Sequence, residues 1–432
     1  MRDIVITLVI FGLLPVAVWR PWVGVMLWAW VSLMAPHRFA WGFAYDMPFA
    51  AAIAGATLVG LFLTRDRVHI PVTPMTVLLL LLPVWMTVTL GFALEQEQAY
   101  PRWISVMKVF LFAFVTMAVL HDKKRIDWLI WVIVISVGYF GVKGGLFTIA
   151  TGGGFKVYGP PGDTYISDNN AISVALVMVM PLMYYLVVTS TSRLVSIGLM
   201  LAMVLSGAAV LGSQSRGAFL AIIAGCAFLL LKSGKKLLVG LVAIVALPVA
   251  IISMPNSWKD RMRTIETYES DASSMGRINA WKMAINLAND RPLVGGGFEM
   301  YSRNTFIRYA PDPEDVHAAH SIYFQMLGEH GYMGLGLFLL VLIFAWRTAA
   351  QLIQKSHERA DWRWAAEMAR AIQVSLVGFC VGGAFINIAY WDLEYYEIAL
   401  LVIATRLLSE GAEQTVAQAA AEAAEPHQSG MV

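Results

Sequence analysis

Two histidines and two arginines supply side chains that could take up a proton or hold an anion. His317 and His320 lie directly before an apolar run that begins at Ser321. Histidine titrates near neutrality, so one at a membrane surface could serve as a general base, with a capping or structural role as the alternative. Arg216 lies in SQSRGAFLA at the end of an apolar run, and Arg277 opens a helical pattern. Because guanidinium forms paired bonds to phosphate, these residues predict a site for an anionic group.

Metal binding is not expected at these histidines. His317 and His320 have the spacing of neighbours on one helix face, but no third nitrogen or sulfur ligand lies close in the sequence. The nearby acids Asp312, Glu314 and Asp315 belong to a proline-containing turn. We therefore expect no metal and no other cofactor.

Other polar residues are supporting candidates. Lys143 lies in the glycine-rich end of an apolar run, where it could also extend to the lipid headgroups, as could Arg216. His317 and Ser321 flank His320. The segment 255–320 is rich in cations, most of which could simply form a solvated face: Lys259, Arg261, Arg263, Arg277, Lys282, Arg291, Arg303 and Arg308. Arg291 is the further supporting candidate from this set.

Composition indicates an all-α polytopic membrane protein. Only 14% of the 432 residues are charged and 58% are hydrophobic, whereas soluble domains carry about 25% charged residues. Apolar runs of about 20 residues recur along the chain, each long enough to cross the hydrocarbon of a bilayer. The net charge of +2 gives no general attraction to nucleic acid. We expect membrane lipid as a partner and no nucleic acid, and the oligomeric state stays open.

The distribution of basic loops predicts the orientation. Ten spans are expected after residue 75, with basic loops alternating from side to side, and the positive-inside rule makes those loops cytoplasmic. The segments 151–170 and 255–320 then face the periplasm of a bacterial inner membrane. Residues 1–64 contain three short apolar runs. We expect two crossings plus one partial element, a cytoplasmic N-terminus and about twelve spans, with thirteen as the alternative.

Four regions follow from this pattern. They are an N-terminal transmembrane bundle (1–254), a periplasmic loop with amphipathic helices (255–320), C-terminal transmembrane helices (321–408) and a disordered cytoplasmic tail (409–432).

The periplasmic loop should contain one clear amphipathic helix. Ser273 or Ser274 could cap it, and Pro292 would end it. Its apolar residues recur at helical spacing: Ile278, Trp281, Ile285 and Ala288. Such a helix would lie on the membrane surface or pack over the bundle.

Three motifs together resemble the O-antigen ligase family. His320-Ser321, followed by Gly331 and Gly334, is similar to that family's histidine at the start of a glycine-bearing span. Arg216 with Leu220 resembles its Arg-x3-Leu element. The run SSMGRINAWKMAINLANDRPLVGGGFEMY is similar to its Gly-Arg-x3-Trp and Arg-Pro-Leu-x-Gly-x-Gly segments. The runs GVKGG and GPPGD…DNN also resemble the branch associated with exosortase systems, although many members have His-Asn where this chain has His320-Ser321.

The resemblance implies a specific reaction on a GT-C-like fold. The family transfers a polysaccharide from undecaprenyl diphosphate to a hydroxyl of the lipid A–core oligosaccharide at the periplasmic face, without a metal. His320 would be the catalytic base, and Arg216 and Arg277 would bind the diphosphate. Direct attack with one base would invert the anomeric configuration. The alternatives are an O-antigen polymerase, a protein O-oligosaccharyltransferase and, in another class, a transporter or flippase for a lipid-linked solute.

Overall fold

The computed structural model describes the chain except for residues 67, 163, 233–253, 264–271, 358–359 and 425–432. The described residues form 15 α-helices and short 3-10 turns. Seven of these helices are long and apolar enough to cross a membrane. The chain is therefore an all-α, multi-pass membrane protein, as its composition predicts.

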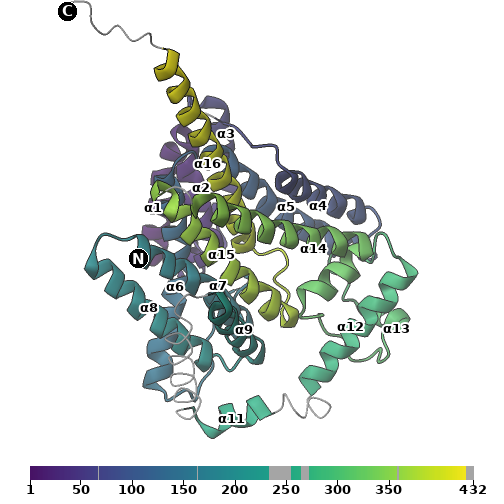
Figure 1. The fold of residues 1–432 in the computed structure, drawn as a ribbon. Helices are drawn as coiled ribbons and strands as arrows, with labels where there is room; N and C mark the ends of the chain where they lie inside the picture. Colours follow the sequence, from purple (N-terminus) through teal and green to yellow (C-terminus); the bar gives the residue numbers. More distant parts are fainter. Residues whose placement is uncertain (67, 163, 233–253, 264–271, 358–359, 425–432) are drawn as a thin grey trace, which may run out of the picture.

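The helices after residue 73 follow the predicted spans closely, apart from 236–254, which falls almost entirely outside the described residues. Among them, α14 packs against α4, α12, α15 and α16 (Figure 1). The bounds are α1 Arg2–Trp19, α2 Pro21–Met34, α3 Phe49–Leu63, α4 Pro74–Leu90, α5 Gln96–Val119, α6 Lys123–Ala150, α7 Asn169–Thr189, α8 Arg193–Gly212, α9 Arg216–Lys232, α11 Asn256–Arg263, α12 Ala272–Asp290, α13 Arg303–Tyr309, α14 Ile322–His357, α15 Arg363–Gly382 and α16 Asp392–Ala424.

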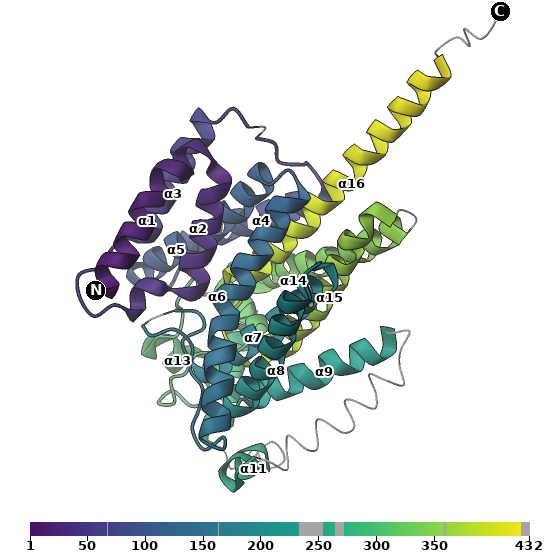
Figure 2. The same cartoon turned by 90° about the vertical axis from the view of Figure 1, so that its left-hand side faces the viewer.

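The N-terminal helices correct the predicted orientation of the chain start. Asp3 accepts hydrogen bonds from the amides of Gly42 and Ala44, at 3.0 and 3.1 Å, so α1 begins beside the α2–α3 connection. That connection and the loop 151–170 line one cavity. The chain start therefore lies at the end of the bundle that carries 151–170, called here the loop end, and three helices (α1 to α3) precede α4 (Figure 2). The sequence predicts two crossings and one partial element here. The structure has three helices, of which α2 and α3, at 14 and 15 residues, are shorter than the candidate spans, so the number of crossings stays a prediction.

The core is centred on α16. Its residues Tyr395 and Tyr396 are almost inaccessible, as is Trp391 just before it. The helix packs against α5, α14 and α15, and so brings the C-terminal helices against the N-terminal bundle. It also continues to Ala424 (Figure 1). The first part of the segment expected to be disordered, up to that residue, is thus helical.

The segment 255–320 contains the predicted helix as α12. Its buried side is formed by Ala280, Met283, Ala284 and Leu287, which pack with Met300 and Phe306 in a small separate core. Ile285, placed on the apolar stripe by the sequence, is instead 36% exposed. The buried face is displaced because α12 packs against α13 and α14, as Figure 1 shows, and these partners decide which side is covered.

The glycine-rich segment after α12 fits a break in α14. Gly331 interrupts that helix with φ 69° and ψ −173°, a conformation essentially restricted to glycine. The break frees the carbonyls of Gly328 and Glu329, which accept hydrogen bonds from the amides of Gly296 and Gly297 at 2.7 and 2.8 Å. The spaced glycines of both motifs therefore join two backbones directly, and they place the first turns of α14 beside α12.

Gly331→Ala is expected to destabilise the fold. The new Cβ would lie 2.5 Å from the carbonyl oxygens of Pro292 and Leu293, in addition to a conformational penalty of about 1–3 kcal/mol. The thermal unfolding midpoint of the purified variant should fall by several degrees. Gly336→Ala, where nothing lies within 4 Å of the added carbon, is the matched control. Equal midpoints for the two variants would contradict this role of Gly331.

Candidate active site

His320 is fixed by its two neighbours in the chain. The Ala319 carbonyl accepts a hydrogen bond from the Trp281 side chain at 2.6 Å, and the Ser321 amide donates to Asn387 Oδ1 at 3.0 Å. His320 itself has a φ of 45°, which non-glycine residues seldom adopt. The histidine is thus held between α12 and the connection from α15 to α16. A backbone fixed in this way suits a group that must be placed within hydrogen-bond reach of a substrate.

The surroundings of His320 favour its neutral form. Burial lowers the pKa of the imidazole most, and the positive charge of Arg277 and the nearby His317 lower it further. Asp168, at the N-terminus of α7, acts in the opposite direction. The net shift is downward from 6.5. A histidine with a lowered pKa is unprotonated at neutral pH, as a general base must be.

The start of α9, at Arg216, lies at the loop end close to the start of α7. Asn169 donates a hydrogen bond to the Ser213 carbonyl at 2.8 Å, which ties the beginning of α7 to the turn before Arg216. Beside it, Gly217 packs against Phe385, in the short turn after α15. That turn also packs against Ile322, two residues after His320. Arg216 therefore lies at the loop end, beside the segment that holds His320. The positive charge of Arg277 lowers the pKa of His320.

Two of the supporting candidates lie next to His320. His317 Nδ1 lies 2.8 Å from Asp315 Oδ1, and the His317 side chain is 47% exposed. Ser321 is buried, and its Oγ has no hydrogen-bond partner among the described residues. Both therefore lie close to His320, and their supporting role stays a prediction.

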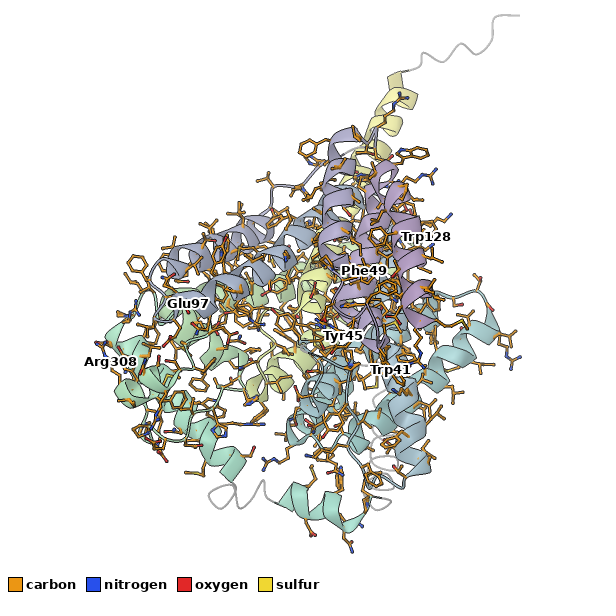
Figure 3. The ribbon with its side chains drawn as sticks, turned by 180° about the vertical axis from the view of Figure 1, so that it is seen from behind. Trp41, Tyr45, Phe49, Glu97, Trp128 and Arg308 are labelled. Carbon is orange, nitrogen blue, oxygen red and sulfur yellow. The ribbon has the colours of Figure 1, made fainter. Side chains whose placement is uncertain are left out.

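The other two supporting candidates have different surroundings. Arg291 donates to the Phe92 carbonyl and so secures the turn after α4. Lys143 lies in a cavity with Arg38 and Tyr158, and Trp41 and Tyr45, labelled in Figure 3, line the same cavity. Neither His320 nor Arg277 is among the described residues that line this cavity.

Sequence reasoning gave no role to Asp168 or Asn169. Asp168 caps α7 by accepting hydrogen bonds from the amides of Asn170 and Ala171, and its charge reaches His320. The available signal was an Asp-Asn-Asn run directly before an apolar span, which is typical of a helix N-cap. Its proximity to His320 depends on α15, which packs against both α7 and α14.

Asp168→Asn should shift the pH profile of any reaction that uses His320 as base. The acid stabilises protonated His320, so its neutralisation should lower the histidine pKa further and move the acidic limb of kcat/KM toward lower pH. Asparagine caps helices as well as aspartate, so the fold should be retained. The measurement is kcat/KM between pH 4 and 8, with Asp312→Asn as a control. An unmoved limb, or a shift toward higher pH, would contradict the assignment.

Two protein-family models match the chain. Residues 201–339 match the O-Antigen ligase family, and residues 1–191 match a family of unknown function (DUF5935). A search of curated proteins finds no match to the chain. The first match includes Arg216, Arg277 and His320, the three residues that the sequence predicts for anion binding and proton transfer. The chain therefore carries a domain of the O-antigen ligase family, preceded by an N-terminal region from a family whose function is unknown.

Proposed function

We propose that this protein is an O-antigen ligase of the bacterial inner membrane. It transfers a polysaccharide from undecaprenyl diphosphate to a hydroxyl of the lipid A–core oligosaccharide on the periplasmic face. The observation that carries the proposal is the position of His320, a partly buried imidazole whose pKa is lowered by burial and by the positive charge of Arg277. One group can take a proton while the other binds the anion that leaves.

The reaction balances with these groups alone. The acceptor oxygen forms a bond to the anomeric carbon, whose bond to the diphosphate oxygen breaks, and the hydroxyl proton passes to His320. Arg277 and Arg216 would stabilise the charge that develops on the leaving diphosphate. Attack opposite the leaving group inverts the anomeric configuration. The proposed mechanism uses no metal ion, so transfer should continue in the presence of EDTA.

The location of the polar groups favours an enzyme over a transporter. His320, Arg277 and Asp168 are gathered at the loop end, where lipid-linked glycan and acceptor would meet. A transporter would instead place its binding residues near the bilayer midplane, between discontinuous helices. A polymerase or a protein O-oligosaccharyltransferase would share the donor and differ in the acceptor.

Acceptor choice tests the function. Purified protein is incubated with undecaprenyl-diphosphate-linked glycan and, separately, with lipid A–core, an unfolded acceptor protein or a second lipid-linked glycan. Transfer to lipid A–core alone supports the ligase. Transfer only to protein or to glycan would assign one of the two related activities, and absence of transfer to all three would refute a transferase of this group.

Cysteine labelling tests the orientation. In a variant without Cys226 and Cys380, a cysteine at Asn304, an exposed position in α13, should react with an impermeant thiol reagent in spheroplasts. A cysteine at Thr191, exposed between α7 and α8, should react only after permeabilisation. The reverse result would place the His320 site on the cytoplasmic face.

A further inference from the structure

A polar stripe extends along α14 from His320 into the bundle. Ser321, Gln325 and Glu329 follow at intervals of four residues, so they lie on one face of the helix. All three are at most 2% exposed. A buried face with three polar side chains costs free energy unless these groups find hydrogen-bond partners. The stripe therefore indicates side chains with a role in binding.

Residues from three other segments meet this stripe. Tyr390, which precedes α16, donates a hydrogen bond to Glu329 and also lies 2.8 Å from His330 Nε2. The Arg102 guanidinium, from α5, is 5.9 Å from the Tyr390 ring centre and 4.7 Å from that of Tyr165, in the loop 151–170.

Residues 299–301, which follow the glycine-rich turn, also contact this group of polar side chains. Arg102 Nε is 3.4 Å from Glu299 Oε1, and the Glu299 side chain is 44% exposed. The Tyr301 hydroxyl faces the backbone of Ala319, the residue before His320. The group is therefore open to the outside at Glu299 and reaches the candidate base at Tyr301.

Several polar atoms of this group have no hydrogen-bond partner in the described part of the chain. They are the hydroxyls of Tyr165 and Tyr301, Ser321 Oγ and Gln325 Oε1. Each is buried, and leaving such a group unpaired costs free energy. Ser321 adjoins His320 and Tyr301 faces Ala319, so the unpaired atoms begin at the candidate base and continue along the stripe, which indicates donors and acceptors arranged for a ligand rich in hydroxyl groups.

The charges identify the ligand class. The Arg102 guanidinium is already paired with the Glu299 carboxylate, and Glu329 adds a second carboxyl group, so this region does not favour a second phosphate. Carboxyl oxygens accept hydrogen bonds, and Arg102 and the tyrosines donate them, which suits the paired hydroxyls of a sugar. The diphosphate has its own cations in Arg277 and Arg216.

We propose that Arg102, Tyr165, Tyr301, Gln325 and Glu329 form a sugar-binding subsite next to His320. It would hold the pyranose ring that carries, or receives, the glycosidic bond, so that the reacting atoms lie at the histidine. The inference rests on the proposed ligase function and adds the residues that position the sugar.

The test removes only the unpaired hydroxyls. Tyr165→Phe and Tyr301→Phe keep the rings and break no hydrogen bond between described residues, so the thermal unfolding midpoint should not change. Tyr158→Phe, from the same loop but lining the Lys143 cavity, is the matched control. Kd is measured with the full chain for three probes: undecaprenyl-diphosphate-linked glycan, undecaprenyl diphosphate without sugar, and lipid A–core.

Each lost hydroxyl should raise Kd about 2- to 12-fold for a sugar-bearing probe. Binding of undecaprenyl diphosphate alone should not change. An effect on the lipid-linked glycan assigns the subsite to the donor sugar, and an effect on lipid A–core assigns it to the acceptor sugar.

Three results would overturn the subsite: all Kd values within about twofold of wild type, an equal loss for undecaprenyl diphosphate alone, or the same loss in Tyr158→Phe. Failure of the ligase proposal is seen separately, as absence of transfer by the wild-type protein, because the binding measurements do not depend on turnover.

Discussion

His320→Ala is expected to lower the rate of glycan transfer by more than about 100-fold, the minimum usual for loss of a general acid–base group. The physical reason is that an acceptor hydroxyl, whose pKa lies far above neutrality, must lose its proton as the new bond forms. The surroundings of His320 favour the neutral imidazole, because burial and the charge of Arg277 lower its pKa. The measurement is initial transfer rate with purified protein, at saturating lipid-linked glycan and lipid A–core.

His317→Ala is the matched control, because His317 lies three residues away and its exposed ring contacts Asp315 at 2.8 Å. Its loss should reduce the rate only a few-fold, through the small effect on the His320 pKa. His320→Gln adds a second test, since glutamine keeps a hydrogen-bonding side chain and cannot titrate. If His320→Gln folds normally and keeps near-full activity with a flat pH profile, the histidine is structural and the base lies elsewhere.

Arg277→Ala and Arg216→Ala should each reduce transfer by about 100- to 1000-fold, the effect of removing one preorganised donor to a developing anion. The charge of Arg277 lowers the pKa of His320, so the guanidinium is near the base. The departing diphosphate would also be near it in the proposed reaction. Lysine at either position should restore activity only partly, because an ammonium lacks the planar pair of donors. The rates are measured together with Kd for undecaprenyl diphosphate, which should rise in both alanine variants.

Arg303→Ala provides the comparison for loss of a cation from the same loop. Its guanidinium is 69% exposed and paired with Glu314 at 2.9 Å, so its removal should change neither rate nor affinity appreciably. Activity within about threefold of wild type in both Arg216→Ala and Arg277→Ala would refute the diphosphate site at these residues. A loss as large in Arg303→Ala would indicate a general effect of loop charge instead of a specific clamp.

The sequence by itself determined the class of the protein and the identity of its principal candidates. Long apolar runs and few charges require an all-α membrane fold, because only helices or closed barrels satisfy the backbone inside lipid. The helix α12 was predictable from local periodicity and from Pro292. Arg216 and Arg277 were selected from their places at a span end and at a helix start, and His320 from its position before an apolar run and from the family motif. Each of these signals lies within a single segment.

Only the tertiary structure decided how these segments meet. The short helices α2 and α3 make the number of N-terminal helices three, and their packing places the chain start at the loop end. The buried side of α12 was set by its contact with α13 and α14, so Ile285 is exposed. Arg102, Tyr165 and Tyr301 come from three distant segments and carry no local motif. Their grouping around Glu329 depends on the break at Gly331, where two backbones pair directly, and no pattern within one segment contains that contact.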